Sequence, residues 1–416
     1  MKRKLWTLLL ALGAALALCA GASAKTEEND FYVALKATDG SIKLENDFVF
    51  ENVMEVNYDL TIDLNGYVLT IPKSICVNSG AHLTIKDSNS NAPHKFKPNS
   101  DGLWVLDETN GTEIVTGGVI TGGTGTQWDQ YYRGGGVYVA PGGTLTMESG
   151  SIVGCSANGN GLSLGGGVYI DSSANSNAGT FTMNGGSIIG CTADGGGGVL
   201  VALECHFTMN TGAVIRSCTA QMGGGVYCLG MSGSSGMFTL NGGTIQSCKA
   251  LGRGGGGVSN SGEFLMQNGS IKGCTSEKDS NKSDGILNSG QFTMSGGTVE
   301  DNVTNSGTIN ADGGTVTVDG VTRPLPKPFI VLATENPVGS AGTQMLPASQ
   351  LDRFMLQLSM GYPNRASTAA LLKDRHHVDP LSACQTVTSP AELEKLIAEV
   401  SNIHVADRIY DYIAEL

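Results

Sequence analysis

The chain is poor in charge, in aromatic rings and above all in basic residues. Charged residues make up 15% of the 416 positions and aromatic residues 6%. Lysine and arginine total 25 against 38 acidic residues, so the net charge is −13. Nucleic-acid-binding proteins need clustered Lys and Arg to neutralise phosphates. The composition therefore excludes a nucleic-acid partner and argues against binding to an anionic membrane surface.

Long hydrophobic runs are absent except at the start of the chain. Lys2, Arg3 and Lys4 precede an apolar run from Leu5 to Cys19, and Ala22-Ser23-Ala24 supplies small residues of the kind that signal peptidases accept. This order is typical of a secretory signal peptide. We expect residues 1–24 to be removed after Ala24, which predicts a secreted or cell-surface protein without a membrane span.

Glycine is abundant, and it belongs to a unit repeated about six times between Gly134 and Asn302. Helical periodicity is lacking throughout this array. Each unit has a glycine run closed by an apolar residue, a short alternating run and a third short run. Examples are Gly165-Gly166-Gly167-Val168, Phe181-Thr182-Met183 and Gly186-Ser187-Ile188. Alternation of this kind indicates strands, and a period of 20–50 residues indicates a solenoid.

The repeat therefore predicts a mainly β protein, a right-handed parallel β-helix with three-strand coils. Inward residues such as Val168, Phe181, Met183 and Ile188 are expected to stack on their counterparts one coil away. A β-propeller is the structural competitor, but its blades need four antiparallel strands, and we count three runs. Residues 126–314 are expected to form the repeats. Residues 25–125 are expected to form irregular first coils that cap the core, with a polar loop at 87–101 around Pro93 and Pro98.

Close cysteine pairs of the Cys-x-x-Cys type, which zinc sites use, are absent. Instead, one cysteine recurs just after the third run of five successive units. These residues form what we call the cysteine file: Cys155, Cys191, Cys218, Cys248 and Cys274. Coils spaced like strands, about 4.8 Å apart, place such residues within disulfide reach. We favour a buried file of small residues over bridged rungs or a soft-metal site, and expect no metal. The pairing of these cysteines stays open.

Acids and bases are sparse in the array and do not recur in register, so no catalytic ladder is predicted. Asp129, Arg133, Asp171 and Arg253 are the residues that loops could bring together. Glycosidases need two facing carboxylates. A polysaccharide lyase or hydrolase therefore requires a cleft with at least two acids and one base. Trp128, Tyr131 and Tyr132 precede the first glycine run. They either stack on sugar rings or pack an insertion onto the coil, and we favour packing.

Residues 50–314 resemble the glycine-rich right-handed β-helix repeats of secreted and surface proteins from gut-type bacteria, similar to adhesin passenger repeats. The resemblance implies an exported, non-catalytic surface protein for adhesion. Its implied partner is a glycan or another host-surface ligand. A glycan array with the mature chain would test this interpretation.

Composition changes near residue 315, where glycine runs stop. Phe329-Ile330-Val331-Leu332-Ala333-Thr334-Glu335-Asn336-Pro337 and Leu351-Asp352-Arg353-Phe354 follow. Residues 315–416 closely resemble the C-terminal part of MoxR-type AAA+ ATPases, which implies a small, partial α/β-to-α fragment. The resemblance implies that Asn336 is the polar sensor at the end of a core strand. It also implies that Arg353 is the arginine finger that reaches a neighbouring subunit's nucleotide.

The residues after this motif predict the start of a helical lid. Ser389, Pro390 and Glu392 form the pattern of a capping box with proline at the first helical position. Leu393, Leu396, Ile397 and Val400 then share one helical face, and Val405 to Leu416 predict a second helix. The resemblance ends at Leu416, before the rest of the lid.

The chain lacks the phosphate-binding loop Gly-x-x-x-x-Gly-Lys-Ser/Thr that such ATPases use. We therefore predict that the chain neither binds nor hydrolyses ATP, needs no cofactor and leaves Asn336 and Arg353 without a nucleotide of their own. ATP and magnesium are implied only for a complete segment. MoxR-like ATPase activity from residues 315–416 is the alternative to the adhesin interpretation.

Overall fold

The structure is a computed structural model. It describes residues 40–128, 130–157, 161–173, 178–231, 233–252, 254–277, 284–311, 313, 315–318, 321–324, 389, 392, 395 and 399. The predicted signal peptide and most of the predicted ATPase-like fragment lie outside the described residues. The chain divides into two compact units, Met1–Leu325 and Pro326–Leu416.

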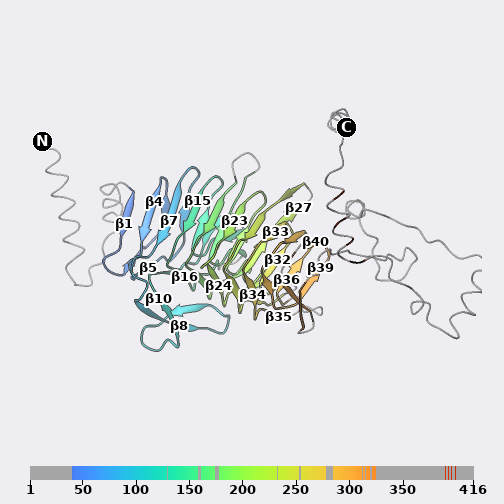
Figure 1. Ribbon diagram of the computed structural model, residues 1–416. Helices are drawn as coiled ribbons and strands as arrows, with labels where there is room; N and C mark the ends of the chain where they lie inside the picture. The colour runs from blue at the N-terminus through green and yellow to red at the C-terminus, as the bar shows by residue number, and fades with distance from the viewer. Residues whose placement is uncertain are drawn as a thin grey trace, which may run out of the picture. The chain divides into compact units, whose positions relative to one another are not determined.

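The first unit consists of parallel sheets whose strands follow one another along the stack from β1 to β40 (Figure 1). Sheet 1 contains β1 (Ser41–Lys43), β4 (Leu60–Asp63), β7 (His82–Lys86), β15 (Thr144–Met147), β19 (Thr180–Met183), β23 (His206–Met209), β29 (Met237–Leu240), β33 (Glu263–Met266), β37 (Gln291–Met294) and β40 (Thr308–Ala311).

Sheet 2 carries the third run of each unit. It contains β2 (Phe48–Val49), β5 (Val68–Thr70), β11 (Val119–Thr121), β16 (Ser151–Val153), β20 (Ser187–Ile189), β24 (Val214–Arg216), β30 (Thr244–Gln246), β34 (Ser270–Lys272), β38 (Thr298–Val299), β41 (Thr315–Val318) and β42 (Val321–Pro324). Its last pair, β41 and β42, is antiparallel.

Sheet 3 begins at the end of each glycine run. It contains β3 (Met54–Val56), β6 (Ile75–Val77), β14 (Val137–Val139), β18 (Val168–Ile170), β22 (Val199–Val201), β26 (Val226–Cys228), β32 (Val258–Asn260), β36 (Ile286–Asn288) and β39 (Val303–Asn305). The chain visits sheets 3, 1 and 2 in this order in each unit, so each sheet receives one strand per unit.

A fourth strand, which the three-strand prediction missed, precedes the glycine run of the repeated units. Sheet 4 contains β12 (Thr126–Trp128), β13 (Tyr131–Arg133), β17 (Leu162–Leu164), β21 (Thr192–Gly195), β25 (Thr219–Met222), β31 (Lys249–Ala250) and β35 (Thr275–Ser276). Most of these segments are short and show no apolar alternation, and the one that does, Leu162-Ser163-Leu164, is not repeated in the other units, so the sequence did not mark them. Within the described part of the chain, no strand of one of these four sheets pairs with a strand of another.

The core is a set of identical side chains stacked from coil to coil, as predicted. Phe181, Phe207, Phe238, Phe264 and Phe292 form one column. Their ring centroids lie 4.8 to 5.0 Å apart and their planes lie within 13° of parallel. Val168 pairs with Val199, Met183 with Met209 and Ile188 with Ile215, and all are buried. The expected inward positions are therefore confirmed.

The predicted loop at 87–101 is wrong in part, because it contains β8 (Pro93–Pro98). This strand pairs antiparallel with β10 (Glu113–Thr116) and β9 (Trp104–Leu106) in a side sheet. Its two prolines stand at the strand ends, where the sheet tolerates a residue without an N–H. Phe96, Trp104 and Val115 of the side sheet pack against sheet 2. Their contacts there are Val119, Val153 and Ile189. A short hairpin, β27 (Gly230–Met231) and β28 (Ser234–Ser235), lies apart from it.

Little helix is present in the described residues. Glu392, Lys395 and Glu399 are helical, and the capping box predicted before them is confirmed. The Glu392 backbone N–H donates to Ser389 Oγ at 3.3 Å, and the Ser389 N–H donates to Glu392 Oε2 at 2.8 Å. No helix in the described part is long and apolar enough to cross a membrane.

Candidate functional site

The glycine runs place sheet 4 against sheet 3 by a tight turn. Gly196 has a φ of +65°, a backbone conformation that residues with a side chain rarely adopt. A Cβ on the next residue, Gly197, would come within 2.5 Å of the Gly224 carbonyl oxygen of the adjacent coil. The turn therefore needs glycine both for its φ and for the close backbone approach. It brings the ends of sheet 4 strands near the outer face of sheet 3.

At the first of these turns, Arg133 and Asp171 form an ion pair. Arg133 ends β13, and Asp171 directly follows β18. Arg133 Nη1 lies 2.6 Å from Asp171 Oδ2, which also accepts a hydrogen bond from the Tyr138 hydroxyl at 2.8 Å. The other carboxylate oxygen accepts from the Tyr169 hydroxyl at 3.2 Å and from the Ser172 N–H at 2.9 Å. Both carboxylate oxygens of Asp171 are thus occupied by donors.

The surroundings keep the two tyrosine hydroxyls protonated and the guanidinium charged. Burial and the negative charge of Asp171 raise the pKa of Tyr138 and Tyr169 well above the ordinary tyrosine value, so both hydroxyls stay donors. Burial works against the charge of Arg133, but Tyr169 and Asp171 raise its pKa overall. The guanidinium also lies over the Tyr169 ring, 5.4 Å from its centroid. The cluster holds β13 over sheet 3, and it presents no free acid or base.

The structure describes two of the four residues that the sequence analysis expected to converge here. Arg133 and Asp171 do meet, whereas Asp129 and Arg253 lie outside the described residues. Tyr138 and Tyr169 were missed, although their signal is present: each follows the valine that closes a glycine run. Tyr131 and Tyr132 are half-buried in the hairpin of β12 and β13, as the packing interpretation expects. The Trp128 side chain is not among those described.

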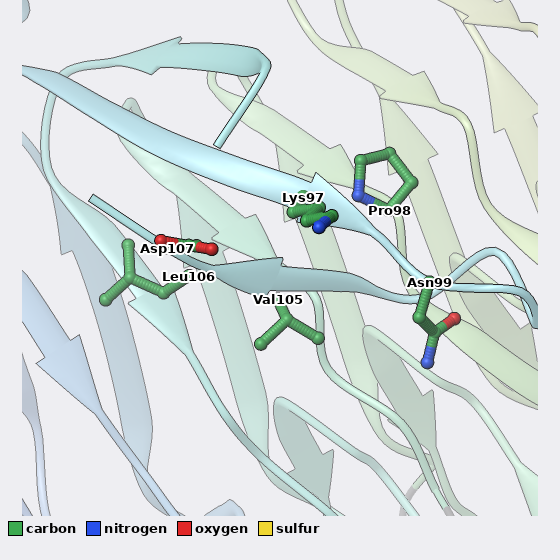
Figure 2. A pocket seen from close by; sticks show the side chains of 6 residues that line it. All are labelled: Lys97, Pro98, Asn99, Val105, Leu106 and Asp107. Atoms are coloured by element: carbon green, nitrogen blue, oxygen red, sulfur yellow. The ribbon is translucent and has the colours of Figure 1, made fainter. Parts of the chain in front are cut away.

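An open hollow of about 280 Å³ lies on the side sheet. Figure 2 shows Lys97, Pro98 and Asn99 at the end of β8, and Val105, Leu106 and Asp107 at the neighbouring β9. Its lining supplies one acid and one base. The polysaccharide lyase or hydrolase hypothesis requires two acids and a base in one cleft, so this hollow does not meet its requirement.

The cysteine file is confirmed as buried. All five thiols are in the core and unpaired in this structure. Among the described residues, no group of three or more His, Cys, Asp or Glu side chains is arranged to hold a metal ion. Asn336 and Arg353 lie outside the described residues, so their predicted roles stay predictions.

Comparison with known proteins gives a match to the end of the chain. The family model described as "ATPase family associated with various cellular activities (AAA)" matches residues 303–356. This chain therefore carries an AAA+ segment. Asn336 and Arg353 both fall within the matched residues. No solved structure matches the chain.

Two curated relatives match over similar lengths. The uncharacterised protein YeaC of Bacillus subtilis (strain 168) is 41% identical over 103 residues, which are 25% of this chain and 32% of YeaC. The chaperone MoxR1 of Mycobacterium tuberculosis (strain ATCC 25618 / H37Rv) is 34% identical over 101 residues, 24% of this chain and 26% of MoxR1. The chain thus spans about a third or less of the length of these relatives.

These findings correct the main functional interpretation of the sequence. The family match and both relatives point to a MoxR-like AAA+ ATPase or chaperone, not to a non-catalytic surface protein for adhesion or glycan contact. The error came from basing the function on the repeat. The repeat occupies most of the chain, but its pattern specifies how strands pack and not which chemistry they support.

Proposed function

We propose that the chain acts through its AAA+ segment in ATP hydrolysis by a MoxR-like, chaperone-type ATPase assembly. The family match at residues 303–356 is the observation that carries this proposal. It is supported by 41% and 34% identity to YeaC and the chaperone MoxR1 over about a hundred residues each. The capping box of Ser389 and Glu392 fits the start of the helical lid that follows the arginine finger in such ATPases.

The proposed division of labour follows from the residues that the sequence contains. Arg353 is the finger that stabilises negative charge developing on the transferred phosphoryl group, and Asn336 is the polar sensor. The sequence has no Gly-x-x-x-x-Gly-Lys-Ser/Thr loop to cradle phosphates. We therefore propose that nucleotide is held by a partner subunit that has this loop. This chain then contributes Arg353 in trans.

We also propose that the four parallel sheets wind as a right-handed parallel β-helix that serves as the scaffold of this segment. The proposal rests on the repeated order of sheets 3, 1, 2 and 4 along the chain and on in-register pairing between consecutive coils. Stacked units of this type bury their apolar faces only against their neighbours.

A complementation assay tests the proposed function. A complete MoxR-type ATPase, with alanine at its own finger position, is mixed with the full-length chain. Because an arginine finger is worth about 10³–10⁵ in rate, the wild-type chain should restore hydrolysis at least about tenfold, and Arg353→Ala should not. Arg365→Ala, a second arginine of the same segment, is the matched control and should behave like wild type.

Three outcomes would contradict the proposal. The first is equal rescue by the wild-type and Arg353→Ala chains, and the second is rescue by neither. The third concerns location, because a finger must meet nucleotide. A signal peptide is predicted for residues 1–24, whereas the proposed function requires the full chain to remain with cytoplasmic ATP. A mature N-terminus at Lys25 in an exported fraction, with no intact chain in the cytoplasm, would argue against an ATPase role.

A further inference from the structure

The cysteine file is a continuous column whose members are neighbours in consecutive coils. The residue that follows each cysteine donates its backbone N–H to the carbonyl of the cysteine in the previous coil. Thr192, Thr219, Lys249 and Thr275 make these bonds to Cys155, Cys191, Cys218 and Cys248 at 2.8 to 3.0 Å. Each thiol donates to the carbonyl of the residue two positions earlier in the chain, for example Cys191 Sγ to Ile189 and Cys218 Sγ to Arg216, both at 3.4 Å. Each cysteine therefore stands one strand spacing from the next.

This spacing is compatible with covalent bridging. Adjacent strands lie about 4.7–4.9 Å apart, which falls within the Cα separation of about 4.4–6.8 Å found in disulfides. The thiols lie on the glycine runs: a Cβ on Gly136, Gly225 or Gly257 would come within 3.3 to 3.5 Å of Cys155, Cys248 or Cys274 Sγ. Glycine at these positions thus leaves the column room to rotate its side chains.

The column has two different ends. Before Cys155 the equivalent position is Gly123, whose carbonyl accepts from the Ser156 N–H at 2.7 Å. After Cys274 the equivalent position is Asn302, which directly precedes β39. Cys274 is the most accessible member at 3% exposure, whereas the other four are at 0%. A small reagent therefore reaches the column first at Cys274.

We propose that the cysteine file is an oxidation site for hydroperoxides, in which adjacent coils become cross-linked in a set order. Cys274 reduces hydrogen peroxide, the O–O bond breaks, and sulfenic acid and water form. The Cys248 thiol then attacks this sulfur, the S–O bond breaks, and a disulfide and a second water form. The sum is two thiols and one peroxide giving one disulfide and two waters.

The order of reaction determines which thiols pair. Once Cys248 and Cys274 are joined, the next free neighbours are Cys218 and Cys191, and a second peroxide joins them. Cys155 is left as a free thiol because the file has an odd number of members. This inference does not depend on the proposed ATPase function, since it concerns the coils alone.

Disulfide mapping of the full chain tests the inference. Cys19→Ser and Cys384→Ser are introduced throughout, so that the described cysteines are read alone. After treatment with hydrogen peroxide, alkylation and digestion, we expect Cys248–Cys274 and Cys191–Cys218 linkages and alkylated Cys155. The melting temperature should rise after oxidation and return on reduction, because the cross-links restrict the unfolded chain.

The position of the pairing provides the decisive control. In Cys274→Ala the file ends at Cys248, so pairing should move by one step to Cys218–Cys248 and Cys155–Cys191. Cys155→Ala should leave the original pairs unchanged, and Cys228→Ala, a buried thiol outside the file, should do the same. Pairing that ignores the loss of Cys274, bonds between non-adjacent coils, or five intact thiols in wild type would each overturn the proposal.

Discussion

At the scale of single residues, stability depends on side chains that repeat in register. The phenylalanine column shows this most clearly, because Phe238 lies between Phe207 and Phe264 with ring centroids 5.0 and 4.8 Å away. Offset stacking of aromatic rings adds to the free energy gained by burying them. A ring in the middle of the column has two such neighbours, so its loss affects two coil interfaces at once.

We expect Phe238→Ala to lower the free energy of unfolding by about 3–5 kcal/mol, the cost of removing a fully buried aromatic side chain. Urea denaturation followed by circular dichroism measures the change. Thr239→Ala, one residue further and on the opposite face of the same strand, is the control and should change stability by less than about 1 kcal/mol. A Phe238→Ala cost no larger than that of the control would show that the column does not carry the core.

The Arg133–Asp171 pair predicts a different single-residue effect. Asp171→Asn keeps the shape but removes the charge that compensates a partly buried guanidinium, so we expect a loss of about 1–3 kcal/mol in the free energy of unfolding. Stability of Asp171→Asn, of Arg133→Leu and of the double variant, measured in one buffer, forms a double-mutant cycle. A coupling below about 0.5 kcal/mol would contradict the ion pair as the link between sheets 4 and 3.

At the scale of elements, Trp104 makes a specific contact between the side sheet and the coils, beside the packing of Phe96 and Val115. The Trp104 N–H donates to the Gly190 carbonyl at 3.0 Å, and the Arg216 guanidinium lies 4.8 Å from the Trp104 ring centroid. Gly190 has a φ of +57°, and a Cβ there would come within 2.1 Å of Trp104 Cγ. Gly190, which directly follows β20 of sheet 2, thus leaves the space that the Trp104 ring occupies.

We expect Gly190→Ala to displace Trp104 and loosen the side sheet. Tryptophan fluorescence should shift to longer wavelength and become more open to acrylamide quenching, in a background with Trp6→Phe and Trp128→Phe. Gly80→Ala separates the two effects of the substitution, since Gly80 also has a positive φ of +78° but its Cβ would meet no atom within 4 Å. Equal spectra for the two variants would contradict docking through Trp104.

At the scale of the whole molecule, the family match and the coil stack overlap. The match begins at residue 303, yet β39, β40 and β41 pair parallel and in register with the coil before them. The hairpin of β41 and β42 then ends sheet 2 with an antiparallel pair. The first compact unit accordingly runs to Leu325. The prediction from composition placed the boundary at residue 315.

We expect the hairpin of β41 and β42 to be protected together with the stack. In hydrogen–deuterium exchange of the full chain, the amides of Val316 and Val318 should exchange as slowly as those of β38, their parallel neighbour. The amides of one cooperative unit are protected from exchange to a similar degree, whereas the amides of a flexible linker exchange without protection. Exchange of 315–324 within seconds would instead place a linker at residue 315.

The sequence by itself determined what local periodicity encodes. The faces of Val168, Phe181, Met183 and Ile188 follow from alternation within short runs, and the Ser389–Glu392 capping box follows from spacing within one turn. In the same way, the motif around Asn336 and Arg353 marked the AAA+ segment that the comparisons support, although the structure does not describe either residue. Each of these signals lies within a few consecutive residues.

Only the tertiary structure decided the remaining features, because each depends on residues that are distant in the chain. Sheet 4 forms from segments that share no repeated alternation, because their backbones pair with the neighbouring coil. Arg133 meets Asp171 across 38 positions, and β8 is a strand despite two prolines because β9 and β10 supply its partners. Such contacts arise from coil-to-coil register, which sets distances that no single run of residues contains.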